Sequence, residues 1–341
     1  MFPLATTHLR FICEAMTPLR LEVENFRAGQ NLRGALGQVM ARTYCAYTPT
    51  STLSRSQDRR TGEGANAAHA ATCPVHWLLA ANEKPGQERR GYTLVPPASE
   101  PAGGIKPGER FEFGITLVGD ALKFLPYFVL AIPEMGRGGV GAGRGKFDLK
   151  SVWAENPLTR ERECLLAEGA NLVHTPTLTM THEQILNSKF KILNSNLQPP
   201  RLASNLQIAI DFLTPLRLIE EGKLAQAPGF DVLFARLLKR LDDLAEQHCG
   251  GNGRPREEID ALENLAACVQ LVESQTRWVE VWSGSNRRGT ASPLSGIVGR
   301  ATYATERAVW ESLLPWLVWG QLAQVGKSTA KGNGVIRICD F

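Results

Sequence analysis

The sequence lacks the features of a secreted or membrane protein. Its seven cysteines are scattered and include no Cys-x-x-Cys pair, which argues against a disulfide framework and favours a reducing compartment. No stretch reaches the ~20 apolar residues that a membrane span requires, and the first residues carry no long apolar run. We therefore expect a cytoplasmic protein with no membrane partner.

The chain also lacks a strong excess of one charge. Its 38 basic and 34 acidic residues leave a formal net charge of +4, a balance that permits an anionic partner without predicting one. Arg accounts for 27 of the basic residues and Lys for 11. Because the planar guanidinium grips phosphate at two points and stacks on bases, this bias favours nucleic-acid binding. A GC-rich genome would produce the same bias.

The length and an internal repeat predict two copies of one unit. The chain has 341 residues, more than the roughly 100 to 200 of a usual domain. Residues 17–21 and 214–218 both read Thr-Pro-Leu-Arg-Leu, and residues 125–129 resemble 314–318 in the same order. The hydrophobic content of 43% excludes a wholly disordered chain. We expect an N-terminal domain with long loop insertions over 1–195 and a C-terminal domain over 196–341.

Hydrophobic periodicity predicts an α+β fold in each copy, with helices on one face of an antiparallel sheet in a βαββαβ-type order. In the first copy we expect strands at 9–13, 110–117 and 146–152 and helices at 31–44 and 120–135. In the second copy we expect strands at 207–213, 277–282, 297–303 and 335–338 and helices at 230–247, 257–272 and 307–324.

Glycine-rich loops with basic residues follow the last helix of each copy, at 135–146 and 326–334. Glycines remove side chains from the backbone, so main-chain amides can approach phosphates closely. The second loop is not a nucleotide-binding loop, because Gly320 precedes Gly326 by one residue too many and a strand follows instead of a helix. The residues predicted to bind RNA in these loops are Arg137, Arg144, Lys146, Gly326, Lys327, Lys331, Gly332 and Gly334.

Two further loops carry clustered arginines. Arg55, Arg59 and Arg60 lie in a long loop rich in Ser and Thr, and Arg287 and Arg288 lie at the turn between two predicted strands. Paired arginines beside short hydrogen-bonding residues suit phosphate or groove contacts in RNA. Solvated loops that add only solubility are the alternative.

Four segments, at 125–153, 212–218, 282–303 and 313–338, resemble the CRISPR-associated RAMP-superfamily endoribonucleases of the Cas-six type. The resemblance spans nearly the whole chain. It implies two tandem ferredoxin-like (RRM-like) domains that bind CRISPR repeat RNA on a basic face and across the cleft between them. It also implies cleavage of precursor CRISPR RNA without a metal or other cofactor.

In such cleavage the ribose 2′-hydroxyl attacks the neighbouring phosphate and leaves a 2′,3′-cyclic phosphate and a 5′-hydroxyl. The resemblance further implies that the protein stays on the 3′ hairpin of the mature RNA and joins other Cas subunits. A noncatalytic RNA-binding subunit with the same fold is the alternative, and a metal-dependent hydrolase is a third hypothesis.

The family's placement of its reactive groups implies candidates on the first helix and in the loop after it. These candidates are Arg33, Arg42 and Tyr44, with His69 as the general base because its usual pKa lies near neutrality. Arg33 and Arg42 are nine residues apart, so they point to opposite sides of a helix.

The same region offers zinc ligands. His69, Cys73 and His76, with Cys45, carry side chains that zinc accepts, but their spacing is loose. We expect instead a packed Cys73 and ordinary surface histidines, and we predict no metal.

Overall fold

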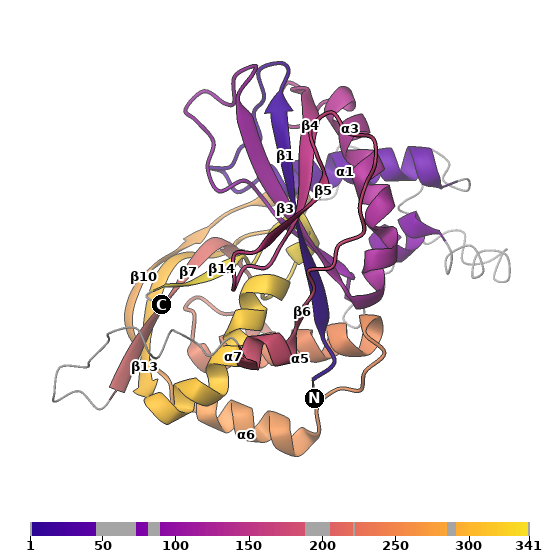
Figure 1. Cartoon of the computed structure of the whole chain (residues 1–341). Coiled ribbons are helices and arrows are strands. Elements are labelled where there is room, and N and C mark those ends of the chain that lie inside the picture. Colours follow the sequence, from indigo (N-terminus) through magenta and orange to yellow (C-terminus); the bar gives the residue numbers. More distant parts are fainter. Residues whose placement is uncertain are drawn as a thin grey trace, which may run out of the picture.

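The structure is a computed structural model that describes residues 2–45, 73–80, 89–187, 205–220, 222–284 and 291–339. Two sheets, each with its own helices, make up the molecule (Figure 1). The predicted domain boundary at 195/196 falls within residues 188–204, outside the described part, and stays a prediction. Of the helices described, none is long and apolar enough to cross a membrane.

The first sheet has the strand order β2-β3-β1-β4-β5, with antiparallel pairing throughout. Its central strand alternates in burial, because Leu9, Phe11 and Cys13 face the helices while the residues between them face outward. The order of β2, β3, β1 and β4 is that of a ferredoxin-like βαββαβ unit. Its elements are β1 (Ala5–Ala15), α1 (Ala28–Tyr44), β2 (Tyr92–Val95), β3 (Arg110–Val118), η3 (Gly119–Phe124), α3 (Leu125–Gly138), β4 (Phe147–Glu155) and β5 (Arg162–Leu166).

The second sheet repeats this order as β10-β13-β7-β14. Leu233, Leu237, Leu241 and Leu244 form the buried stripe of α5, as their spacing predicts. The helices pack on one face of the sheet (Figure 1). Its elements are β7 (Asn205–Leu216), α5 (Phe230–His248), α6 (Arg256–Ala267), β10 (Gln270–Val279), β13 (Gly296–Glu306), α7 (Arg307–Ala323) and β14 (Ile336–Cys339). The predicted fold class, two tandem ferredoxin-like units, is confirmed.

One hydrogen bond recurs at the same place in both copies. The backbone N–H of Lys146 donates to Thr17 Oγ1 at 2.8 Å, and the backbone N–H of Val335 donates to Thr214 Oγ1 at 2.9 Å. In each copy the threonine opens the Thr-Pro-Leu-Arg-Leu segment, and the donor follows the last glycine of the glycine-rich loop. The sequence repeat therefore corresponds to a structural repeat.

The short remaining elements connect the two sheets or extend them. The strand β6 pairs with the start of β1, and α4 contacts α7 of the second unit. In this contact Trp319 Nε1 donates to His182 Nδ1 at 3.1 Å, so the first unit is joined to the second core. These elements are η2 (His76–Ala80), β6 (Met180–Thr181), α4 (His182–Asn187), β8 (Ile219–Glu220), β9 (Lys223–Leu224), β11 (Trp282–Gly284), β12 (Ala291–Pro293) and η5 (Thr329–Lys331).

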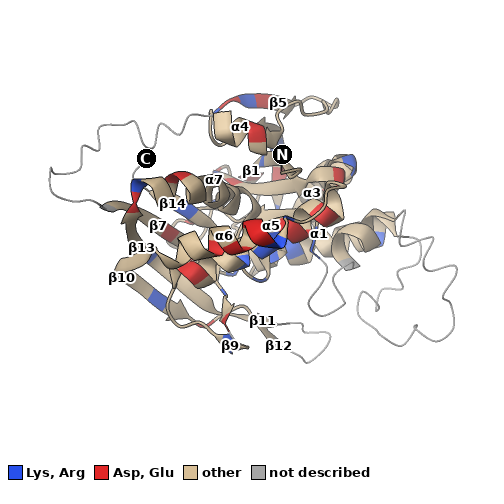
Figure 2. Cartoon of the chain, turned by 90° about the horizontal axis from the view of Figure 1, so that it is seen from below, with Lys and Arg blue, Asp and Glu red and all other residues tan. Residues whose placement is uncertain are grey.

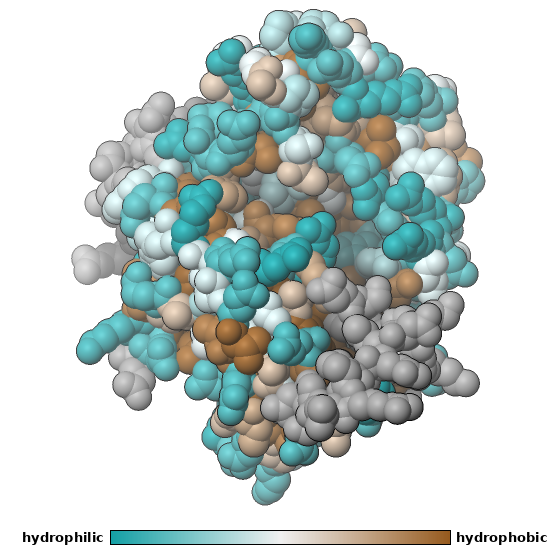
Figure 3. Space-filling model, turned by 90° about the vertical axis from the view of Figure 1, so that its left-hand side faces the viewer, coloured by the Kyte–Doolittle hydropathy of each residue, from teal (hydrophilic) through white to brown (hydrophobic). Residues whose placement is uncertain are grey.

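Two sequence predictions for strands were wrong. The sequence reading missed β2, and it extended the helix at 257–272 into residues that form β10. Nearly every residue of β10 is exposed, because the strand lies at the edge of its sheet, so it has no alternating pattern to recognise. Leu271 and Val272 are among its exposed apolar residues, and Figure 3 shows apolar patches between hydrophilic residues on this side of the molecule.

Glycines of the first loop allow the chain to approach its own backbone. Gly141 has φ 71°, and a Cβ there would overlap the carbonyl oxygen of Arg20. Gly143 has φ 81°, but a Cβ there would meet nothing within 4 Å. The two residues thus share a left-handed backbone and differ only in their surroundings.

We expect Gly143→Ala to lower the free energy of unfolding by about 1 kcal/mol, the penalty of the left-handed conformation alone. Gly141→Ala should lower it by about 3 kcal/mol, because the new methyl also forces the loop away from Arg20. Urea unfolding of both variants measures the difference. Equal losses would show that the close approach contributes nothing to stability.

Candidate functional site

The C-terminal glycine-rich loop is held by a buried arginine. Arg240, from α5, is 4% exposed. Its guanidinium donates to the carbonyl oxygens of Ala323 at 2.9 Å and Gln324 at 3.0 Å, and to Thr329 Oγ1 at 2.9 Å. Burial, followed by the nearby charge of Arg89, lowers the pKa of Arg240 to about 9, so it stays protonated at neutral pH. Arg240 therefore ties the end of α7 to the loop.

The loop reaches across to the first unit. Its short turn η5 packs against β2 and α1. A Cβ at Gly29, in the first turn of α1, would overlap the carbonyl oxygen of Lys331, so the helix and the loop are in direct backbone contact. Arg33 lies about one turn further along α1. This contact places Arg33 of α1 beside Lys331 of the loop.

Three cations from three segments converge here, and we call Arg33, Arg90 and Lys331 the Lys331 cluster. Burial, then the charges of Arg33 and Arg90, lower the pKa of Lys331 below its usual 10.5. Lys331 Nζ donates to Ser283 Oγ at 3.3 Å. Within the described residues, neither Arg33 nor Lys331 forms an ion pair with a carboxylate. Because Arg33 and Lys331 repel each other and have no carboxylate partner among the described residues, they are candidates for binding an anion such as phosphate.

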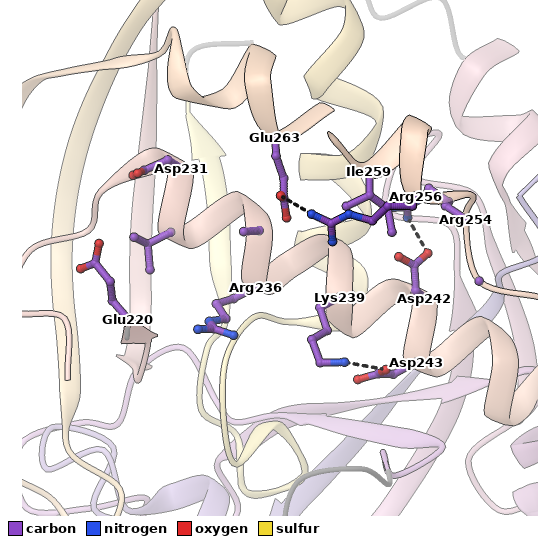
Figure 4. Close-up of a pocket in the computed structure, with 13 residues that line it drawn as sticks. Glu220, Asp231, Arg236, Lys239, Asp242, Asp243, Arg254, Arg256, Ile259 and Glu263 are labelled. Carbon is purple, nitrogen blue, oxygen red and sulfur yellow. Dashed lines mark hydrogen bonds and ion pairs between the residues drawn. The ribbon is translucent and has the colours of Figure 1, made fainter. Parts of the chain in front are cut away.

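A cavity of about 760 Å³ between α5 and α6 has a different character. Its cations are paired: Lys239 Nζ lies 3.3 Å from Asp243, Arg254 lies 3.4 Å from Asp242, and Arg256 bridges to Glu263 (Figure 4). Acidic and basic residues lie side by side along α5 (Figure 2). Because these charges neutralise one another, this cavity is a poor site for a polyanion.

The other candidates on α1 lie far from Arg33. At 1.5 Å per residue, Arg42 and Tyr44 are ~14 and ~16 Å further along the helix axis. Arg42 is exposed in the last turn. Tyr44 packs edge-on against Tyr127 with ring centroids 5.1 Å apart, and burial, followed by Glu134, raises its pKa. The structure therefore does not bring Arg42 or Tyr44 into the Lys331 cluster.

The predicted basic residues of the first glycine-rich loop are largely engaged within the loop itself. Arg137 forms an ion pair with Glu134. The guanidinium of Arg144 donates to the carbonyl oxygen of Gly138 at 2.7 Å. Lys146 is exposed, and its backbone N–H bonds Thr17. Of these three residues, only the side chain of Lys146 has no described partner.

The glycines of the second loop face the chain's own backbone. A Cβ at Gly326 would lie 2.8 Å from the carbonyl oxygen of Arg217, and one at Gly334 would overlap that of Val325. Gly332 packs against Gly29 and Pro96. These glycines permit close packing inside the protein, a use that the sequence interpretation overlooked. Their contact with RNA stays a prediction, as does that of the exposed Lys327.

Several predicted residues lie outside the described part of the chain: His69, Arg55, Arg59, Arg60, Arg287 and Arg288. Sequence reasoning missed Arg90 and Ser283. The signal for Arg90 was the Arg89-Arg90 pair directly before β2, which was not recognised because β2 itself was missed.

Several described histidines have partners away from the cluster. The His8 ring lies 2.7 Å from Thr116 Oγ1, and His248 Nε2 lies 2.8 Å from the carbonyl oxygen of Arg89. His76 Nδ1 lies 3.8 Å from Cys45 Sγ. The chain also has a group of three potential metal ligands, Cys45, Cys73 and His76, beyond the end of α1 opposite Arg33.

Two family models match the chain. The model AF_1859_N, described as an N-terminal domain, matches residues 3–178, which is more than half of the sequence. The model for CRISPR-associated endoribonuclease Cas6 matches residues 210–336. A search of curated proteins finds no match.

Solved Cas6 structures share this fold. Thermus thermophilus Cas6 (TTHB231) has a TM-score of 0.53 and 15% identity, with 98% of each chain covered. A Cas6 (TTHB231) product complex has a TM-score of 0.53 and 17% identity over 98% of this chain and 99% of that one. A partial Cas6-RT-Cas1--Cas2 complex gives a TM-score of 0.58 at 11% identity over 98% of this chain and 46% of that one.

At these low identities the structural similarity establishes a shared fold, and the family models add the relationship in sequence. With the AF_1859_N model on its first half and the Cas6 model on its second, the chain belongs to the CRISPR-associated Cas6 endoribonucleases, which process CRISPR RNA.

Proposed function

We propose that this protein cleaves precursor CRISPR RNA within its repeats by attack of a ribose 2′-hydroxyl on the adjacent phosphate. The P–O bond to the next 5′-oxygen breaks, which yields a 2′,3′-cyclic phosphate and a 5′-hydroxyl. No electron transfer and no metal are needed for this step. The observation that carries the proposal is the Lys331 cluster, where cations from both copies meet without a described counter-charge on Arg33 or Lys331.

The cluster supplies what the transition state requires. Negative charge builds on the phosphorane oxygens as the 2′-oxygen attacks, and fixed cations stabilise that charge more than the ground state. Arg33 and Lys331 are held in place by the contact between α1 and the glycine-rich loop, so they need little reorganisation. We assign both residues to this role.

The remaining candidates receive the following roles in this proposal. His69 stays the proposed general base. Arg42 and Tyr44, at the other end of α1, are assigned to RNA contacts that flank the cut. The basic side chains of both glycine-rich loops and of the two arginine loops are assigned to the RNA backbone.

We also propose that the protein acts in the cytoplasm, stays on the 3′ hairpin of its product and works with other Cas subunits. The base of the hairpin formed by β11 and β12, which leads to Arg287 and Arg288, lies at the Lys331 cluster through Ser283. This contact supports retention, because the strand that contacts Lys331 is followed in the sequence by Arg287 and Arg288, whose side chains suit contacts with the RNA backbone.

RNA that copurifies with the protein should be a discrete population sharing one repeat-derived end. A transcript of that repeat should be cut by the protein to give a cyclic phosphate, and a single 2′-deoxy substitution at the mapped cut should abolish cleavage, because the nucleophile is gone. Mass spectrometry of the RNA ends identifies the shared end of the copurifying RNA and the ends of the cleavage products. Intact RNA despite tight binding would favour the noncatalytic subunit, and 3′-hydroxyl ends would favour a metal-dependent hydrolase.

Lys331→Ala and Arg33→Ala should each lower the single-turnover cleavage rate by about 100-fold, because each removes a fixed charge from the transition state. RNA affinity should fall by no more than about tenfold, since many other phosphate contacts persist. Lys239→Ala, which removes an exposed cation already paired with Asp243, is the matched control and should leave cleavage within about twofold. Equal effects in all three variants would exclude a special role for the cluster.

The pH dependence of RNA binding provides a further test. The pKa of Lys331 is lowered, so its charge, and with it the contribution to affinity, is lost as pH rises through a value below 10.5. Affinity of the wild type should therefore begin to fall at a lower pH than it would with an unperturbed lysine at this position. Lys331→Arg should bind without this decline, because a guanidinium stays protonated there. Parallel pH profiles for the two proteins would contradict the assignment.

A further inference from the structure

Two thiols and an imidazole meet at the C-terminal end of α1. Cys45 is the residue that ends the helix, Cys73 lies three residues before η2, and His76 is the first residue of η2. One ligand atom from each residue lies within 4.8 Å of the other two. Residues 46–72 separate the two sides in sequence, so the chain leaves this point and returns to it.

The spacing of the ligand atoms suits a tetrahedral zinc ion. Zn–S and Zn–N bonds of ~2.3 and ~2.0 Å at tetrahedral angles place a sulfur and a nitrogen ligand ~3.5 Å apart. Cys45 Sγ and His76 Nδ1 are 3.8 Å apart. A small closure of the site would bring the two atoms to that separation.

The surroundings of the Cys73 sulfur also favour metal binding. The backbone N–H groups of His76 and Val75 both donate to this sulfur. Hydrogen bonds of this kind favour the thiolate, which is the form that binds metal. Cys45 and Cys73 are 7% and 4% exposed, so bulk water competes little for the site.

We propose that Cys45, Cys73 and His76 bind a zinc ion that fastens the end of α1 to η2, with a water molecule at the fourth position. The sequence favoured a packed cysteine and surface histidines instead, because the spacing of the candidate ligands is loose. This inference does not depend on the proposed cleavage chemistry, since the zinc has a structural role.

The proposed zinc site would support the Lys331 cluster through η2. The carbonyl oxygen of Leu78 accepts a hydrogen bond from Arg90 Nη1 at 3.4 Å. Leu79 lies against Gly37 on α1, which also neighbours the guanidinium of Arg33. Fixing η2 to the end of α1 thus restrains two of the three cations in the cluster.

Zinc content tests the proposal directly. Protein purified under reducing conditions and reconstituted with one equivalent of zinc should retain about one zinc per chain after desalting, as measured by mass spectrometry of the metal. Cys45→Ser, Cys73→Ser and His76→Gln should each lower retained zinc at least about fivefold. Cys268→Ser, at an exposed cysteine after α6, is the matched control and should retain zinc fully.

Cobalt provides a readout that does not need the variants to fold. Wild-type protein loaded with Co²⁺ should show the thiolate-to-cobalt charge-transfer band and the visible bands of a tetrahedral site. No zinc retained by the wild type, no thiolate band with Co²⁺, or undiminished zinc in all three ligand variants would each overturn the proposal. A Cys45–Cys73 disulfide in freshly purified protein that zinc does not prevent would also overturn it. None of these readouts depends on RNA cleavage.

Discussion

The buried guanidinium of Arg240 fixes the part of the molecule on which the candidate site depends. It bonds the last turn of α7, the residue after it and the glycine-rich loop at once, so the loop has a defined exit from the helix. Burying an unpaired charge is costly unless its donors are satisfied, and here carbonyl and hydroxyl oxygens satisfy several of them. This anchor acts together with the backbone contact between Gly29 and Lys331 to fix the loop relative to α1.

Like charges lie close together in the Lys331 cluster. Arg33, Arg90 and Lys331 repel one another, and this repulsion adds to burial, the larger cause, in lowering the pKa of Lys331. The tight contact of Gly29 with the loop backbone keeps them together, because packing at this contact resists their separation. In the proposed function, a phosphate of the RNA would relieve this repulsion.

Sequence reasoning predicted the architecture well where patterns are strong. The leucine stripe of α5, the alternation of β1 and the repeated Thr-Pro-Leu-Arg-Leu segment predicted two similar units correctly, because their hydrophobic faces are buried. It failed at β10, an exposed edge strand without alternation, and at β2, a short strand buried at three of its four positions.

The site was predicted only in part. Arg33 and Lys331 were named from different motifs, yet nothing in the sequence indicated that they would meet each other or Arg90. Cys45 and Cys73 were weighed as ligands and set aside, since sequence distance hides spatial contact. The sequence analysis correctly expected close backbone approach at the glycines. The groups approached in the structure are the protein's own carbonyl oxygens, whereas the sequence analysis expected phosphates.

The recurring threonine hydrogen bond shows how the two copies differ. Both loops keep the bond and the glycines that fit against the following backbone, yet Arg144 of the first loop bonds its own turn while Lys331 of the second extends toward the other copy. The loop of the first copy therefore closes on itself, whereas the loop of the second copy reaches the other half of the molecule. The fold is symmetric but its contacts are not, and cations of both copies meet at the second loop.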